Sequence, residues 1–137
     1  MRERWSDVRG IDPMSEKQRT NAMRLLESRR VPYTAHHYSA EIHSAEGVAE
    51  TLGFPAAQVF KTLVALPQRG KPLLAIVPGD RELDLKALAK AAGDKKVHMA
   101  SQKEAEALTG LKVGGISALA LLDKGFRVYL DASAQAY

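Results

Sequence analysis

The stretch VFKTLVAL at residues 59–66 is the strongest fold signal in this chain. Its β-branched and aromatic residues, and its short length, are typical of a buried strand. A second apolar run, LLAIV at 73–77, follows after PQRGK at 67–71, whose proline and glycine are typical of a turn. Together the three segments predict a β-hairpin.

Helices are predicted on both sides of this hairpin. The segments 44–53, 84–93 and 101–110 each begin with Ser or Asp, which are good N-caps, and each end at a glycine. The third begins with SQKE, which matches a capping box. An earlier helix is predicted over 15–30, where it ends before Pro32 because the residue preceding a proline avoids the helical conformation. The residues of this helix expected to be buried are Ala22, Met23 and Leu26.

Further strands are predicted over 33–38 and 97–99. The apolar segments 118–122 and 126–130 flank Asp-Lys-Gly, and they are expected to form a second hairpin. Short helices interleaved with hairpins predict an α+β domain around a mostly antiparallel, mixed sheet.

Length and composition indicate one globular domain. The chain has 137 residues, of which 45% are apolar and 26% charged. Cysteine is absent, which excludes disulfides, thiolate zinc sites and a cysteine nucleophile. No apolar run approaches the length of a membrane span, and residues 1–13 lack the apolar centre of a secretory signal. We expect a cytoplasmic protein in which residues 1–13 are an extension, disordered or non-native, and residues 14–137 form the domain.

The chain is mildly basic, with a formal net charge of +4. The excess of Lys and Arg lies between residues 61 and 103, which hold nine basic and four acidic side chains. If these basic groups gather on one face, they form a surface that attracts phosphates. The alternative is an ordinary solvated surface.

Lys61 is unusual because it lies inside the apolar stretch 59–66. Strand periodicity places it on one face with Val59, Leu63 and Ala65, and places Thr62 on the other. A lysine here could lie on a sheet edge, where it discourages aggregation. Alternatively, it directs a cation at a carbonyl oxygen or a phosphate, with the Thr62 amide serving the same cavity.

The segment Gly114-Gly115-Ile116-Ser117 is the second unusual feature. Adjacent glycines let backbone N–H groups converge on an oxygen or an anion, although a tight turn or bulge explains them as well. The spacing matches neither a Walker A loop nor a G-x-G-x-x-G fingerprint. The four histidines, His36, His37, His43 and His98, lack the spacing of a metal site, so no metal is predicted. Tyr38 ends the predicted strand, where its hydroxyl could line a cavity.

Several motifs resemble the YbaK/prolyl-tRNA-synthetase-associated editing domain family when they are taken together. They are QVFKTLV at 58–64, DLK at 84–86, KKV at 95–97, TG at 109–110 and VGGIS at 113–117. The resemblance covers about residues 15–137, and the GGIS segment is most similar to the free-standing YbaK-type Cys-tRNA(Pro) deacylases. It implies an α+β fold with a mixed sheet or barrel flanked by helices.

The resemblance implies a trans-editing enzyme that cleaves the aminoacyl ester of mischarged tRNA, with Cys-tRNA(Pro) as the leading substrate. Lys61 matches the family's invariant lysine, which would bind the 3′ end and stabilise charge at the acyl carbonyl. Tyr38 and Thr62 match pocket residues, and Gly114, Gly115 and Ser117 belong to a loop that would orient the aminoacyl group. No metal or cofactor is implied. The nucleophile is either the thiol of a cysteinyl substrate or water.

Three departures from the family pattern matter. The segment between Tyr38 and Ser44 is short, which favours Ala-tRNA(Pro) or another small amino acid as an alternative substrate. Ala118 replaces the proline that usually follows GGIS. The chain stops at Tyr137, before the last strand and helix of the family, so we expect an unpaired sheet edge. A non-catalytic module that binds tRNA or prolyl-tRNA synthetase is the alternative of another class, and the oligomeric state stays open.

Overall fold

The structure, a computed structural model, describes residues 19–137. The predicted extension over 1–13 and the start of the predicted helix over 15–30 lie outside the described residues. The chain divides after His37 into two compact units. In the described part of the chain, no helix is both long and apolar enough to cross a membrane.

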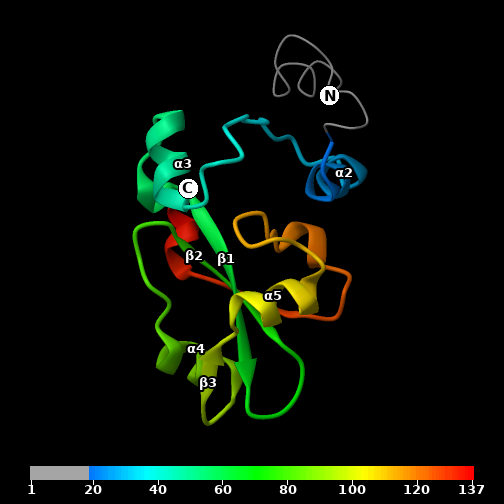
Figure 1. The fold of residues 1–137 in the computed structure, drawn as a ribbon, viewed down its shortest axis with the longest axis vertical. Helices are drawn as coiled ribbons and strands as arrows, with labels where there is room; N and C mark the ends of the chain where they lie inside the picture. The colour runs from blue at the N-terminus through cyan, green and yellow to red at the C-terminus, as the bar shows by residue number, and fades with distance from the viewer. Residues whose placement is uncertain (1–18) are drawn as a thin grey trace. The chain divides into compact units, whose positions relative to one another are not determined.

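A four-stranded mixed sheet organises residues 38–137 (Figure 1). Its strands are β1 (Phe60–Pro67), β2 (Leu73–Pro78), β3 (Val97–Met99) and β4 (Arg127–Leu130), in the order β3-β1-β2-β4. β1 runs antiparallel to β2 and β3, whereas β4 runs parallel to β2. The α+β fold, the first hairpin and the strand over 97–99 are therefore confirmed. The sheet is open rather than a closed barrel, because β3 and β4 lie at its two edges.

The three capped helices after Tyr38 are also confirmed. They are α3 (Ala45–Leu52), α4 (Leu85–Ala92) and α5 (Gln102–Thr109). Ser44, Asp84 and Ser101 each accept a hydrogen bond from a backbone N–H in the first turn, which satisfies one of the free donors there. Short 3-10 helices complete the fold at Ala56–Gln58 (η1), Leu119–Leu121 (η2) and Ala132–Ala136 (η3).

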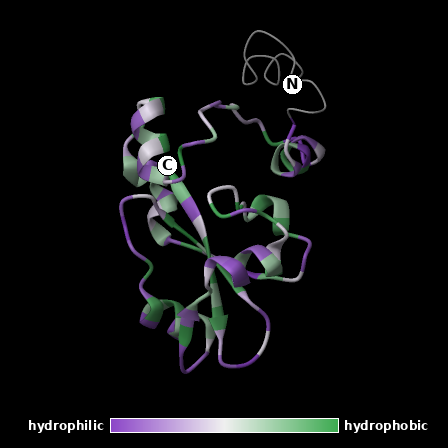
Figure 2. Cartoon of the chain, in the orientation of Figure 1, coloured by the Kyte–Doolittle hydropathy of each residue, from purple (hydrophilic) through white to green (hydrophobic). Residues whose placement is uncertain are grey.

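Both faces of the sheet are buried, so successive residues of its central strands belong to different clusters. Ala65 and Ala75 pack with Leu88 and Ala89 of α4. Val64 instead packs on the other face in a cluster that also holds Leu74, Ala105, Ala118 and Leu121. This division follows from the two-residue period of a strand. Figure 2 shows hydrophobic residues along the strands and hydrophilic ones in the loop between β1 and β2.

The second predicted hairpin is wrong. Leu119–Leu121 forms the 3-10 helix η2, and Ala118 and Leu121 are buried by the sheet cluster rather than exposed on alternate faces of a strand. Arg127–Leu130 does form a strand, but it pairs in parallel with β2. A five-residue apolar run fits a strand or a helical turn equally well, and here tertiary packing selects the turn.

Within residues 19–37, the structure contains the helix α2 (Asn21–Ser28). Its N-cap is Thr20, so the predicted helix is confirmed over a shorter range. Ala22, Met23 and Leu26 are only half-buried, which makes their predicted burial wrong. The strand predicted over 33–38 is also wrong, because these residues pair with no other strand in the part of the chain that is described.

Candidate active site

A pocket of about 680 Å³ opens beside the first half of β1. This volume lies in the range of small-molecule sites, roughly 300–1,000 Å³. Five parts of the chain line the pocket: the segment leading into α3 with the start of that helix, strand β1 with Val59, Gly79 after β2, the end of β3 with the start of α5, and the loop after α5. All the site residues predicted from the sequence lie in its wall, namely Tyr38, Lys61, Thr62, Gly114, Gly115 and Ser117.

The pocket exists because β1 lacks a strand neighbour along part of its length. β3 pairs only with residues 65–67 of β1, and the N–H of Ala100 donates to the carbonyl oxygen of Val64 at 3.0 Å. Backbone groups of alternate residues in a strand point the same way. Those of Thr62 therefore point, like those of Val64, toward the open edge. The Thr62 backbone can thus offer an N–H and a carbonyl to a bound molecule.

Lys61 lies in the wall of the pocket. Its Nζ donates to the carbonyl oxygen of Gly79 at 3.4 Å, and the side chain is partly buried. Of the residues that line the pocket, Lys61 is the only Lys or Arg, and Glu46 the only carboxylate. This position favours the interpretation of Lys61 as a cation aimed at a ligand over that of a solvated edge lysine.

Gly79 was not predicted to belong to the site, although it holds the Lys61 ammonium. A Cβ atom at Gly79 would lie 2.8 Å from the Cβ of Ala45 and 2.8 Å from the carbonyl oxygen of Val59. Only glycine therefore lets the start of α3 pack against the end of β2. The sequence signal was the glycine directly after the second strand, which marks a close backbone approach.

The glycine loop is a tight turn. The N–H of Gly115 donates to the carbonyl oxygen of Lys112 at 2.8 Å, and Gly114 has φ +94°, as the third residue of a type II turn requires. Glu106 of α5 supports the turn by accepting from the N–H of Val113 at 2.9 Å. The two glycines therefore do not present their N–H groups together. The Gly115 N–H closes the turn, whereas that of Gly114 donates to no described residue.

Thr62 connects this loop to β1. Its Oγ1 accepts from the N–H of Ala118 at 3.4 Å, and Ala118 is buried. A proline at position 118 has no N–H and could not make this bond. The departure from the family pattern thus adds a contact between the loop and the sheet. Ser117 precedes Ala118 and is half-buried in the pocket wall.

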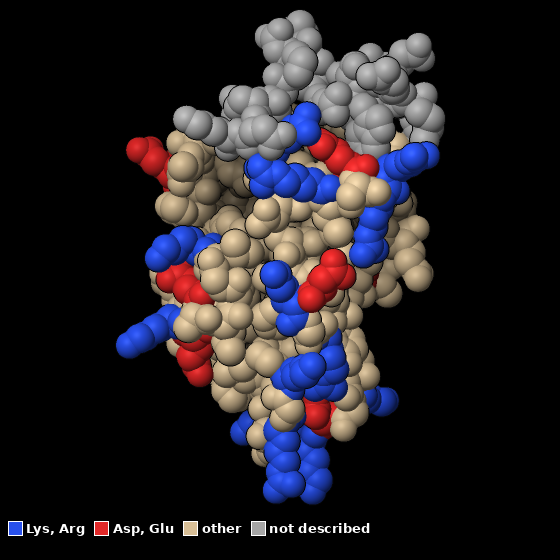
Figure 3. Space-filling model, turned by 90° about the vertical axis from the view of Figure 1, so that its right-hand side faces the viewer, with Lys and Arg blue, Asp and Glu red and all other residues tan. Residues whose placement is uncertain are grey.

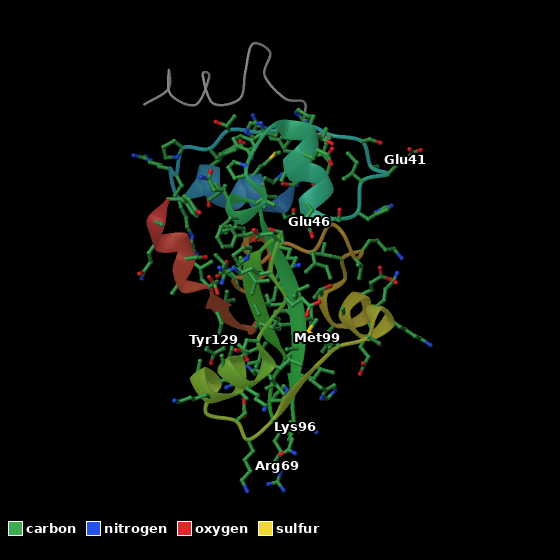
Figure 4. The ribbon with its side chains drawn as sticks, turned by 90° about the vertical axis from the view of Figure 1, so that its left-hand side faces the viewer. Glu41, Glu46, Arg69, Lys96, Met99 and Tyr129 are labelled. Carbon is green, nitrogen blue, oxygen red and sulfur yellow. The ribbon has the colours of Figure 1, made fainter. Side chains whose placement is uncertain are left out.

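His43 faces the glycine loop, and it too was not predicted to line the pocket. A Cβ atom at Gly114 would lie 3.4 Å from Nδ1 of His43. Glu46 from the first turn of α3 and Met99 from β3 also line the pocket (Figure 4). The only signal for His43 and Glu46 was their position beside the Ser44 cap. In the described residues, no group of three or more His, Asp or Glu side chains could hold a metal ion.

Ser101 and Gln102 bring the capping box of α5 to the pocket wall. The Glu104 carboxylate accepts from the backbone N–H of Ser101 at 2.9 Å, and Ser101 Oγ accepts from the N–H of Glu104 at 3.1 Å. The first of these bonds is the main cause that lowers the pKa of Glu104, with the Ser101 side chain second. The box fixes this part of the wall to the start of the helix.

Known proteins resemble this chain in sequence and in fold. EbsC of Enterococcus faecalis, described as a candidate Cys-tRNA(Pro)/Cys-tRNA(Cys) deacylase, is 47% identical over 123 residues, covering 88% of this chain and 74% of EbsC. The proline–tRNA ligase of Pelotomaculum thermopropionicum is 30% identical over 124 residues, covering 90% of this chain but 20% of the ligase. A solved structure of a candidate trans-editing enzyme for prolyl-tRNA synthetase has a TM-score of 0.73 at 25% identity, covering 91% of this chain and 78% of the other.

The sequence profile of the aminoacyl-tRNA editing domain matches residues 39–137, which include every residue of the pocket wall except Tyr38. This chain therefore belongs to the aminoacyl-tRNA editing domain family.

Proposed function

We propose that this protein is a trans-editing deacylase that cleaves the ester of mischarged tRNA, with Cys-tRNA(Pro) as its substrate. The observation that carries the proposal is the single pocket that unites Lys61, Thr62 and the Gly114 turn. The 47% identity to EbsC over most of both chains supports the cysteinyl substrate. We further infer that residues 14–137 act as one editing domain and that the enzyme works in the cytoplasm, where charged tRNA is used.

The chemistry that the pocket can perform is stabilisation of charge at the acyl carbonyl. As an ester is attacked, its carbonyl oxygen becomes negative, and a preorganised cation in a partly dry site stabilises that charge. The Lys61 ammonium bonds a backbone carbonyl and no carboxylate among the described residues, so its charge is not neutralised by an ion pair. The free N–H of Gly114 and the backbone groups of Thr62 would hold the aminoacyl end in place.

The substrate itself supplies the nucleophile in this proposal. The thiol sulfur of the cysteinyl group attacks its own acyl carbon, a C–S bond forms, and the bond from that carbon to the ribose oxygen breaks. The thiol proton passes to the departing ribose oxygen, which leaves a free tRNA and a cyclic thioester. This route requires no base beside Lys61. With an alanyl substrate, water would attack instead, and the products would be alanine and tRNA.

The deciding experiment is single-turnover deacylation of Cys-tRNA(Pro) and Ala-tRNA(Pro). Wild-type protein is compared with Lys61→Ala and with Lys103→Ala, a control that removes an exposed lysine outside the pocket wall. We expect rapid loss of the cysteinyl ester, a fall of about 10²–10³-fold in Lys61→Ala, and no change in the control. Faster loss of the alanyl ester would identify an alanine deacylase. No hydrolysis by folded wild-type protein, with tRNA still bound, would identify a binding module instead.

A further inference from the structure

Four basic side chains gather at the end of the sheet that lies away from the pocket. Arg69 and Lys71 belong to the turn between β1 and β2, and Lys95 and Lys96 immediately precede β3. The two segments are neighbours because Pro67 at the end of β1 pairs with Val97 of β3. Arg69 and Lys96 project from this same end in Figure 4. These four residues are called the basic tip below.

The charges of the basic tip are open to a partner. All four side chains are exposed, and none makes an ion pair with a described residue. Asp94 is the nearest acidic residue in the sequence, but its carboxylate is bonded to Arg127 at 3.1 Å. Figure 3 shows Lys and Arg side chains at this lower end of the molecule. Such a group of unpaired cations attracts an anionic partner.

The composition around the basic tip favours RNA over protein as that partner. Protein interfaces have a buried apolar centre that is depleted of charge. No large apolar side chain is exposed in the segments 67–72 and 93–97 that form the tip. Unpaired Lys and Arg without an apolar centre are instead typical of surfaces that bind phosphates without reading sequence.

The distance along β1 indicates which part of an RNA would reach the tip. Lys61 and Pro67 lie six residues apart on β1, which corresponds to about 20 Å at 3.3 Å per residue. An aminoacyl ester held at Lys61 is therefore too far away to touch the tip. Only nucleotides further along the same RNA can do so.

We propose that the basic tip binds the backbone phosphates of the RNA body behind the aminoacylated 3′ end, while the pocket holds the ester. This inference rests on the proposed deacylase function. In this arrangement the sheet separates two binding sites that have different functions. Chemistry occurs beside Lys61, and sequence-independent capture of the tRNA occurs at the tip.

The test compares two double variants that remove the same charge. Lys95→Gln/Lys96→Gln removes half of the tip, and Lys86→Gln/Lys103→Gln removes two exposed lysines of α4 and α5 outside it. Binding of uncharged tRNA is measured over a range of salt concentrations. We expect the tip variant to bind about tenfold more weakly at low salt and to reduce the magnitude of the salt slope by about 1–2. The control should keep the wild-type slope.

Kinetics separate the tip from the pocket. The tip variant should lose about tenfold in kcat/KM on full Cys-tRNA(Pro) but should cleave a short cysteinylated 3′-end oligonucleotide at the wild-type rate. The proposal would be overturned if the tip variant and the control variant lost the same amount of kcat/KM on tRNA. It would also be overturned if the tip variant cleaved the short cysteinylated oligonucleotide more slowly than wild type. Unchanged tRNA binding together with lost binding to purified prolyl-tRNA synthetase would overturn it as well, and would identify a protein partner. The binding measurement stands even if the wild-type protein hydrolyses neither ester.

Discussion

Gly114 and His43 face each other at the pocket, with Nδ1 of His43 at a contact distance of 3.4 Å from the place that a Cβ of residue 114 would take. Gly114 also has φ +94°, which costs an L-residue about 1–2 kcal/mol. We therefore expect Gly114→Ala to lower the free energy of unfolding by about that amount, and to lower deacylation at least tenfold by shifting the turn that faces His43.

Gly115→Ala is the matched control for this change. Gly115 does not have a positive φ, and its added Cβ would meet only the carbonyl oxygen of Lys112, at an ordinary 3.5 Å. We expect stability within about 0.5 kcal/mol of wild type, as for a typical surface substitution. Chemical denaturation and single-turnover deacylation of both variants check this pair. Equal effects of the two substitutions would show that the shape of the turn at Gly114 is unimportant.

Lys61 should be needed for activity but not for the fold. Its hydrogen bond to the Gly79 carbonyl is long, at 3.4 Å, so its loss removes little stability. Lys61→Met keeps the aliphatic stem and removes the charge. We expect an unchanged Tm with a fall of about 10²–10³-fold in deacylation. A large drop in Tm would instead assign Lys61 a structural role.

Lys61→Arg separates charge from shape. A guanidinium keeps the positive charge but replaces a compact ammonium with a planar fork. If the shape of the pocket requires an ammonium, Lys61→Arg should recover less than about one-tenth of the deacylation rate that Lys61→Met loses relative to wild type. Full recovery in the same single-turnover assay would show that charge alone suffices at this position.

Much of the fold could be predicted because its signals are local. The strand around Lys61, the caps at Ser44, Asp84 and Ser101, and the first hairpin all depend on residues close together in sequence. The second hairpin could not be predicted, because the burial of Leu121 against the sheet decides its conformation. That burial is a tertiary effect that no local pattern contains.

The site was predictable only in part for the same reason. Lys61 and the paired glycines are unusual in their own segments, so they could be singled out from the sequence. His43 is ordinary in its segment, and the position of Gly79 after a strand marks a close backbone approach without indicating which segment approaches. They become part of the pocket because α3 packs against the end of β2, where Gly79 leaves room for Ala45. Their roles depend on a contact between segments far apart in the chain.

The capping box of α5 predicts a dependence of stability on pH. Glu104 accepts from Ser101 N–H, which lowers the pKa of the folded carboxyl below the ordinary 4.5. A lowered folded pKa means stabilisation that is fully present above pH 4.5 and is lost as pH falls through the folded pKa. Glu104→Gln keeps an acceptor but cannot ionise.

Chemical denaturation of wild type and Glu104→Gln should therefore show their largest difference near neutral pH. The difference in free energy of unfolding should shrink as the pH falls below 4.5. Ser101→Ala serves as the comparison, because it removes the hydroxyl half of the box without changing the carboxyl. A difference that grows in acid would have the wrong sign for this mechanism.

The bond between Thr62 and Ala118 predicts a specific coupling. Ala118 has φ −61°, which suits proline. Ala118→Pro should therefore raise the free energy of unfolding by about 0.4–1 kcal/mol, because proline reduces the conformational entropy of the unfolded chain. It also loses the N–H that donates to Thr62 Oγ1, a bond that contributes about 0.5–1.5 kcal/mol. These effects nearly cancel, so we expect a change in stability below about 1 kcal/mol. Thr62→Val removes the same hydrogen bond by removing its acceptor, Thr62 Oγ1.

A double-mutant cycle then isolates the bond. If Ala118 N–H and Thr62 Oγ1 interact, the costs of Ala118→Pro and Thr62→Val should add to more than the cost of the double variant, by about 0.5 kcal/mol or more. Activity should separate the two single variants, because Ala118→Pro leaves the Thr62 hydroxyl free to face the pocket, whereas Thr62→Val removes it. Strictly additive stabilities would mean that the 3.4 Å contact contributes nothing and that burial of Ala118 alone holds the loop against β1.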